Sequence, residues 1–254
     1  MRPQRFYDFL SRYEAILERH VGWQKLEFEG RHVLEVGCGP LLGFGLIALY
    51  RGAASYSAME PQFDPCVLDE PAIVDTYFLG VFNDLSAIYG PRYEFPEFME
   101  LLKNRTRITP EPLLETPLTG PFDVVLSNSC LEHIFDFEAS MRCLRQLCAT
   151  NYRYLHLVNF SSHRASKSPF AGLYAVDADS YVAQFGNHIN LLRAPDILAA
   201  MTAAGFAPQL APYVYFKDFF EEPIHESWAK RYSEEELFLH TAIISGPTTV
   251  PAAC

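Results

Sequence analysis

The chain has 254 residues, of which 49% are hydrophobic and 20% charged, a balance typical of one globular domain with a well-buried core. Its formal net charge is −11, and because an acidic surface repels phosphate backbones we expect no nucleic acid as substrate. The first 20 residues lack the apolar core of a signal peptide, and no apolar run approaches the ~20 residues that span a bilayer, so we expect no membrane association.

The hydrophobic pattern predicts helices and strands that alternate along the chain. Apolar side chains at helical spacing predict a first helix over residues 4–20. Strands are expected at 33–36, 56–59, 106–108, 122–126, 154–160, 212–216 and 237–245, and further helices at 43–50, 72–89, 95–102, 138–148 and 194–204. Strands that alternate with helices favour parallel pairing, and the last two strands favour an antiparallel finish.

Two segments stand apart from this alternation. The segment 61–105 is longer than a simple crossover needs, and its predicted helices are rich in Tyr and Phe. We expect this insertion either to wall a substrate pocket or only to pack against the sheet. We expect residues 1–28 to form an N-terminal helical lid on a single domain that spans residues 1–254.

The six cysteines lie mostly within apolar segments and include no Cys-x-x-Cys pair. Free thiols in the reducing cytoplasm are therefore expected, and a zinc site is not.

A tight glycine turn, Gly37-Cys38-Gly39, follows the first predicted strand. Such a turn lets the backbone approach a nucleoside, and Glu60, 23 residues after Gly37, is placed to bind a ribose diol. A dinucleotide fingerprint needs a third glycine where this chain has Leu42. Glu35 would oppose a bound pyrophosphate but suit a ligand that carries an ammonium and a sulfonium. These residues favour S-adenosylmethionine over a dinucleotide.

Three motifs resemble those of the class I S-adenosylmethionine-dependent methyltransferases of small-molecule type. Residues 33–40 look like motif I, residues 122–133 with their Leu-Glu-His ending resemble the fourth-strand motif, and residues 193–206 are similar to the late helix and its Ala-Gly-Phe turn. The resemblance implies an α/β, Rossmann-like methyltransferase fold. Its sheet would be mostly parallel and seven-stranded, with an antiparallel last strand and helices on both faces.

The resemblance also implies that S-adenosylmethionine is the cofactor. The glycine turn would cradle its methionine part, with Glu35 supporting the turn or meeting the amino group through water, and Glu60 would bind the ribose hydroxyls. The loop after the fourth strand would flank the adenosyl and methionine groups, and the adenine would lie near residues 109–112. The cofactor-binding residues expected in this way are Glu35, Gly37, Cys38, Gly39, Glu60, Asn128 and Ser129.

Two histidines follow predicted strands at the carboxyl edge of the sheet, where open α/β folds bind ligands. His133 and His163 are candidate general bases for a hydroxyl or carboxyl acceptor. Alternatively, His133 only caps structure beside the cofactor and His163 is a solvated loop residue. His156, inside the fifth strand, is expected to be a core histidine.

The remaining candidates are residues that could contact the methyl acceptor. The two tyrosines of the first helix could close over the sulfonium, and Arg193 could pair a substrate carboxylate or merely cap a helix. The substrate-binding residues expected are Tyr7, Tyr13, Asn159, His188 and Arg193. No metal site is expected, because the fourth strand ends in Ser127-Asn128 rather than in a run of acids.

The sequence therefore predicts a cytoplasmic methyltransferase that moves a methyl group to an oxygen or nitrogen of a small molecule, in a biosynthetic setting such as specialised metabolism. Two other interpretations stay open. One is a catalytically silent S-adenosylmethionine-binding scaffold or partner subunit, and the other is an NAD-dependent oxidoreductase.

Overall fold

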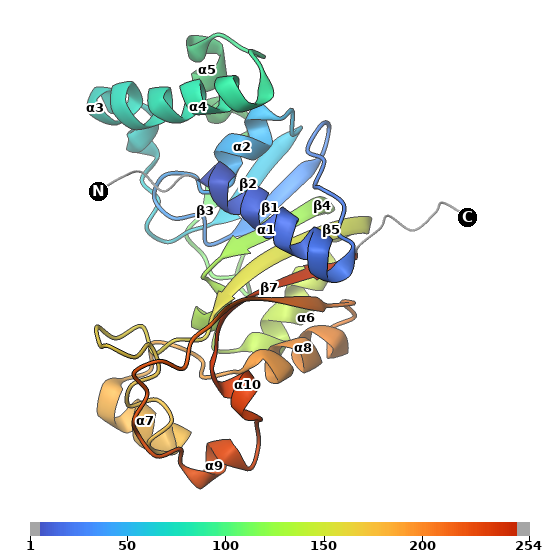
Figure 1. The fold of residues 1–254 in the computed structure, drawn as a ribbon. Coiled ribbons are helices and arrows are strands. Elements are labelled where there is room, and N and C mark those ends of the chain that lie inside the picture. Colours follow the sequence, from blue (N-terminus) through green and yellow to red (C-terminus); the bar gives the residue numbers. More distant parts are fainter. Residues whose placement is uncertain (1–5, 248–254) are drawn as a thin grey trace.

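A seven-stranded sheet runs through the middle of the protein, with helices on both faces (Figure 1). The computed structural model describes residues 6–247. The strands are β1 (His32–Val36), β2 (Ser55–Met59), β3 (Thr106–Thr109), β4 (Phe122–Asn128), β5 (Cys148–Asn159), β6 (Gln209–Tyr215) and β7 (Leu239–Gly246). Their order is β3-β2-β1-β4-β5-β7-β6, and only β7 runs antiparallel to its two neighbours. The predicted fold class is confirmed.

One face of the sheet is covered by α1 (Phe6–Val21), α2 (Gly45–Tyr50), α4 (Leu79–Tyr89) and α5 (Phe95–Arg105), and Figure 1 shows α1 lying across it. The other face is covered by α6 (Phe137–Leu147) and α8 (Ala194–Ala203). Successive side chains of a strand point to opposite faces, so Val33 packs in the first layer while Leu34 and Val36 pack in the second. Both layers are apolar, as parallel strands buried on both sides require.

The insertion packs as an aromatic layer against α2. It contains α3 (Pro71–Ile73), a π-helical turn (Val74–Phe78), α4 and α5, so the helix predicted over 72–89 is continuous but locally widened. The ring of Tyr50 lies 6.0 Å from that of Phe82 and 5.6 Å from that of Phe98, and its hydroxyl donates to the Gly90 carbonyl over 2.7 Å. These contacts hold the two helices of the insertion to the sheet domain.

A third apolar cluster forms a small lobe at the end of the molecule away from α3–α5 (Figure 1). It includes α7 (Ala178–Phe185), α9 (Glu226–Ala229) and α10 (Glu234–Leu237), with Tyr174 and Trp228 packed edge to face at 5.4 Å. These short helices were not predicted from the sequence. The predicted start of the last strand at residue 237 is wrong, because Leu237 ends α10 and β7 begins two residues later.

Within the described residues, no helix is long and apolar enough to cross a membrane.

Candidate active site

A cavity of about 820 Å³ opens at the carboxyl ends of β1, β2 and β4. The strand order reverses at β1, and open α/β sheets bind ligands at such a point. The lining residues are 36–39, 59–62, 110–115, 128–130, 133–136 and 140. Of the insertion, all of which is described, only Pro61 and Gln62 line the cavity. The loop predicted to lie near the adenine, residues 109–112, contributes residues 110–112, and residues 113–115 after it also line the cavity.

The glycine turn forms one wall of the cavity. Gly37 has φ +75°, and a Cβ there would lie 2.6 Å from Cys130 Sγ, so the loop after β4 can approach only a glycine. Gly39 has φ +65° and no atom within 4 Å of an added Cβ, which leaves open space beside its backbone. Leu42, at the place of the missing third glycine, still has φ +68°, and its side chain is fully buried. The turn thus keeps a left-handed conformation there without a glycine.

Glu60 connects the end of β2 to this turn. Its Oε2 accepts a hydrogen bond of 2.7 Å from the Gly39 amide, and its Oε1 accepts one of 3.0 Å from the Gln62 amide. A carboxylate oxygen has two lone pairs, so both oxygens keep capacity for a further donor in the cavity.

Glu35 lies beneath the turn and is not among the cavity-lining residues. Its fully buried Oε2 accepts hydrogen bonds of 2.8 Å from the Phe44 amide and 2.7 Å from the Tyr56 hydroxyl, whereas Oε1 has no partner. Burial raises the pKa of Glu35 to about 8. Of the two predicted roles, support of the turn is therefore the one that its contacts match.

The loop after β4 brings two more predicted residues to the cavity. Asn128 Oδ1 accepts a hydrogen bond of 2.8 Å from the Tyr13 hydroxyl. Ser129 has φ +51°, and its amide donates to the Leu157 carbonyl over 3.0 Å. Tyr13, predicted to touch the acceptor, instead positions a cavity-lining side chain.

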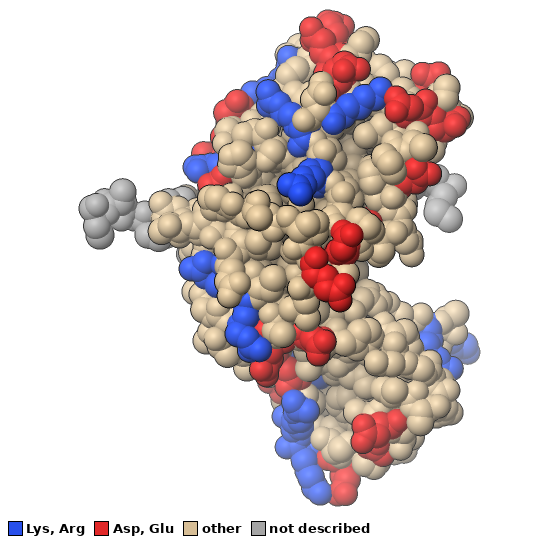
Figure 2. Space-filling view, turned by 180° about the vertical axis from the view of Figure 1, so that it is seen from behind, with Lys and Arg blue, Asp and Glu red and all other residues tan. Residues whose placement is uncertain are grey.

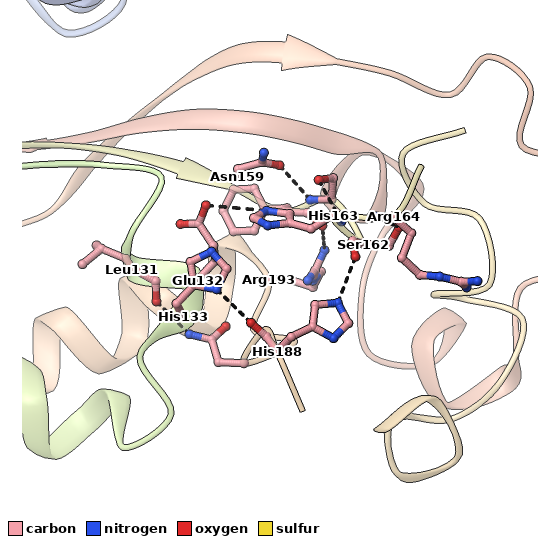
Figure 3. Close-up of polar contacts among 12 residues, drawn as sticks. Leu131, Glu132, His133, Asn159, Ser162, His163, Arg164, His188 and Arg193 are labelled. Atoms are coloured by element: carbon pink, nitrogen blue, oxygen red, sulfur yellow. Dashed lines mark hydrogen bonds and ion pairs between the residues drawn. The ribbon is translucent and has the colours of Figure 1, made fainter. Parts of the chain in front are cut away.

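A cluster of histidines and one acid adjoins the cavity, and Figure 3 shows how its side chains lie. His133 lines the cavity, and its ring centroid is 5.0 Å from that of His163. His163 Nε2 is 3.8 Å from Glu132 Oε1, and the Glu132 side chain is almost fully buried. Burial raises the pKa of Glu132 to about 8 and lowers that of His163 to about 4, so the uncharged form of each is favoured at neutral pH. The two candidate bases therefore lie side by side, with His133 nearer the cavity.

The other predicted acceptor contacts lie outside the cavity wall. Tyr7 donates to Asp84 between α1 and α4, and the buried Arg193 guanidinium donates to the Phe160 carbonyl over 2.6 Å. Asn159 Oδ1 accepts from the Ser161 amide, which orders the loop before His163. The His188 carbonyl accepts a hydrogen bond of 2.8 Å from His133 Nδ1.

Asn190 fixes the short helical turn Leu131–His133, a role that was not predicted from the sequence. Its side-chain amide donates to the carbonyls of Leu131 and Ile134, both over 2.9 Å, and its backbone amide donates to the Glu132 carbonyl. Phe135, a cavity-lining side chain that is 50% exposed, was not among the predicted site residues. The Asn-His-Ile-Asn sequence before Arg193 was the signal available for Asn190.

A family model described as a methyltransferase domain matches residues 2–210. The chain belongs to this family, the S-adenosylmethionine-dependent methyltransferases of class I fold. The S-adenosylmethionine-dependent methyltransferase of Mesorhizobium loti is similar in structure, with 15% identity, a TM-score of 0.52 and coverage of 96% of this chain and 97% of that one. A putative one from Listeria monocytogenes has 11% identity, a TM-score of 0.51 and coverage of 94% and 96%. A search of curated proteins finds no match.

The cavity of this methyltransferase fits the cofactor that its family implies. Gly39 leaves open space where any other residue would project a side chain, and Glu60 offers carboxylate oxygens that a ribose diol can share. When bound, S-adenosylmethionine supplies a methyl group on a positively charged sulfur. The protein's own residues must hold both reactants in line and keep water out.

Acidic and basic side chains are interspersed over the face shown in Figure 2.

Proposed function

We propose that this methyltransferase transfers a methyl group to an oxygen or nitrogen of a small molecule. The observation that carries the proposal is that two chemically different groups of residues line one cavity. The glycine turn and Glu60 line it, and so do His133 and Phe135. Such a cavity can hold a nucleoside donor and a small acceptor together, which is what displacement at carbon needs.

The acceptor side favours a flat, partly apolar molecule with an ionisable group. Phe135 lines the cavity two residues after His133, and its side chain is 50% exposed. His133 donates from Nδ1 to a carbonyl, so in the neutral ring Nε2 keeps a lone pair that can take part in removing the acceptor's proton. The net charge of −11 argues against a nucleic acid acceptor, and the five free cysteines among the described residues fit a reducing cytoplasm.

The proposed roles of the predicted residues follow from these contacts. Gly37, Cys38, Gly39, Glu60, Asn128 and Ser129 would hold the donor. Glu35 would keep the turn in shape, and Tyr13 would keep Asn128 in place. His133 and His163 would serve the acceptor, with Asn159 and His188 positioning them. Tyr7 and Arg193 are left out, because their polar groups are held by other parts of the protein.

Calorimetry with S-adenosylmethionine tests the donor site. The native protein should bind it, and Glu60→Ala should lower the affinity by about 1–3 kcal/mol, the usual cost of lost hydrogen bonds to a charged group. The matched control is Glu100→Ala, an exposed acid on α5 outside the cavity. No binding by the native protein would overturn the proposal.

Turnover is tested with methyl-labelled S-adenosylmethionine and a library of small phenols, carboxylic acids and amines, read by mass spectrometry. A methylated product that the native protein forms and His133→Ala forms much more slowly supports the proposal. Donor binding without any product favours the silent scaffold instead. Family membership leaves the oxidoreductase interpretation without support.

A further inference from the structure

Three side chains that can bind a metal ion converge beside the cavity. Glu132 and His133 lie on the short turn after β4, and His163 lies on the loop after β5 (Figure 3). One ligand atom from each lies within 4.8 Å of the others. We propose that Glu132, His133 and His163 bind a divalent first-row transition-metal ion.

The burial of the Glu132 carboxyl group is the feature that points to a bound cation. The residue is only 3% exposed, and within residues 6–247 no donor makes a hydrogen bond of normal geometry to either carboxylate oxygen, although the backbone amides of Glu132 and Asn159 lie near them. The nearest basic group, His163 Nε2, is 3.8 Å away, which is beyond hydrogen-bond distance. A buried carboxyl group without a hydrogen-bond partner is costly whether or not it is charged, and an ion bound between these groups would supply a partner for its carboxylate form.

His133 is already held as a metal-binding histidine usually is. Its Nδ1 donates to the His188 carbonyl over 2.8 Å, so Nε2 is the nitrogen with a free lone pair. A second hydrogen bond of this kind fixes the tautomer and orientation of metal-binding imidazoles. The Asn190 side chain donates to two carbonyls of the same turn, which fixes the backbone that carries Glu132 and His133.

His163 is brought to the cluster by a strained loop. It has φ +54°, a left-handed conformation that a residue other than glycine adopts only when its surroundings enforce it. Ser162 helps to fix the loop, because its amide donates to the Pro169 carbonyl over 2.7 Å. The His163 side chain keeps 24% of its surface exposed, so an ion could enter from solvent.

The donor set suits a first-row divalent ion better than calcium or magnesium. Two imidazoles and one carboxylate with open positions are typical of zinc and iron sites, whereas the hard cations prefer oxygen ligands only. Metal–ligand distances of roughly 2.1 Å require ligand atoms about 3–4 Å apart, so small side-chain rotations would close the site.

The consequence for catalysis rests on the proposed function, although binding of the ion does not. Because His133 lines the cavity, an ion at its Nε2 would face the acceptor side. An acceptor hydroxyl bound in an open position would lose its proton to water more readily. The two histidines would then act through the ion instead of taking the proton themselves.

Titration with Co²⁺, followed by visible absorption after removal of metals with a chelator, tests the site. We expect one Co²⁺ per chain in the native protein and at least tenfold weaker binding in Glu132→Gln and in His163→Ala. His20→Ala, which removes an exposed histidine at the end of α1, should bind as the native protein does. Glu132→Gln keeps the side-chain shape, so it remains informative if the alanine variant fails to fold.

Donor binding separates this proposal from the previous one. Neither Glu132 nor His163 lines the cavity, so both variants should still bind S-adenosylmethionine, which also reports that they are folded. A native protein that binds no Co²⁺, or variants that bind it as tightly as the native protein, would overturn the metal site. Either result would leave the donor site intact.

Discussion

The Tyr13 hydroxyl donates a hydrogen bond of 2.8 Å to Asn128 Oδ1, which joins the N-terminal helix to the last residue of β4. Tyr13 is 2% exposed and packs edge to face against Tyr213 at 5.6 Å. Since Asn128 lines the cavity, α1 controls the position of a cavity side chain without touching the cavity itself.

Tyr13→Phe should therefore weaken donor binding. The variant keeps the ring packing but loses the donor to Asn128, at a cost of about 0.5–1.5 kcal/mol in unfolding free energy. Urea unfolding and calorimetry with S-adenosylmethionine measure the two effects. Tyr93→Phe is the control, because the Tyr93 hydroxyl makes no hydrogen bond within residues 6–247. Unchanged donor affinity in Tyr13→Phe would show that Asn128 needs no support from α1.

Two glycines offer a matched pair for the turn. Gly39 has φ +65° and Gly22, after α1, has φ +68°, and neither has an atom within 4 Å of an added Cβ. Alanine at either position should lower the unfolding free energy by about 1–2 kcal/mol, the cost of a left-handed L-residue. Only Gly39→Ala should also weaken donor binding, because its methyl group enters the cavity. Equal donor affinities in the two variants would argue against the turn as a donor site.

Glu35 should make the protein less stable as the pH rises. Burial raises its pKa in the folded protein to about 8, so between about pH 4.5 and 8 the folded state binds more protons than the unfolded state. The free energy of unfolding then falls with pH, by at most about 1.4 kcal/mol per pH unit from this group.

Glu35→Gln should remove that dependence. The amide oxygen can still accept from Phe44 and Tyr56, while nothing titrates. Urea unfolding from pH 4 to 9 should show the variant gaining stability relative to the native protein between about pH 4.5 and 8 and running parallel to it above pH 8. Parallel curves throughout would mean that Glu35 is not held neutral.

His156, by contrast, should make the protein less stable as the pH falls. It is fully buried in β5, with Nδ1 2.8 Å from Ser127 Oγ, and burial lowers its pKa to about 3. The unfolded chain takes up this proton near pH 6.5 while the folded chain does not, so stability falls as the pH drops from about 6.5 toward 3. The free energy of unfolding of His156→Asn should lack this acid dependence, and its pH curve should run parallel to that of the native protein above about pH 7. An unchanged acid slope would contradict the prediction.

Much of the candidate donor site could be predicted because its signals are local. A glycine needed at a left-handed φ, an apolar strand before it and an acid after the next strand all appear in the sequence at short range. The face of the sheet to which the Glu35 side chain points was harder to predict, since its charge suggested that it contacts a ligand. Strand alternation puts it on the same face as Val33, under α2, where Tyr56 meets it.

The histidine cluster that we propose serves the acceptor could be predicted only in part, because it is assembled from distant segments. The motif at 131–133 and the position of His163 after a strand were visible in the sequence. Their meeting depends on Asn190 and on the small lobe, whose short helices carry no clear periodic pattern. For the same reason neither acids at one strand end nor cysteine pairs could reveal the proposed metal-ligand set, which is divided between two loops.

Leu42 holds a backbone conformation that its own chemistry disfavours, and its buried side chain keeps it there. The shape of the proposed donor pocket therefore depends on how the buried Leu42 side chain packs in the interior. Substitutions among the buried neighbours of this leucine should change how tightly the donor is held, even though they never touch it. Efforts to retune the enzyme for altered donors should sample these interior positions together with the pocket wall.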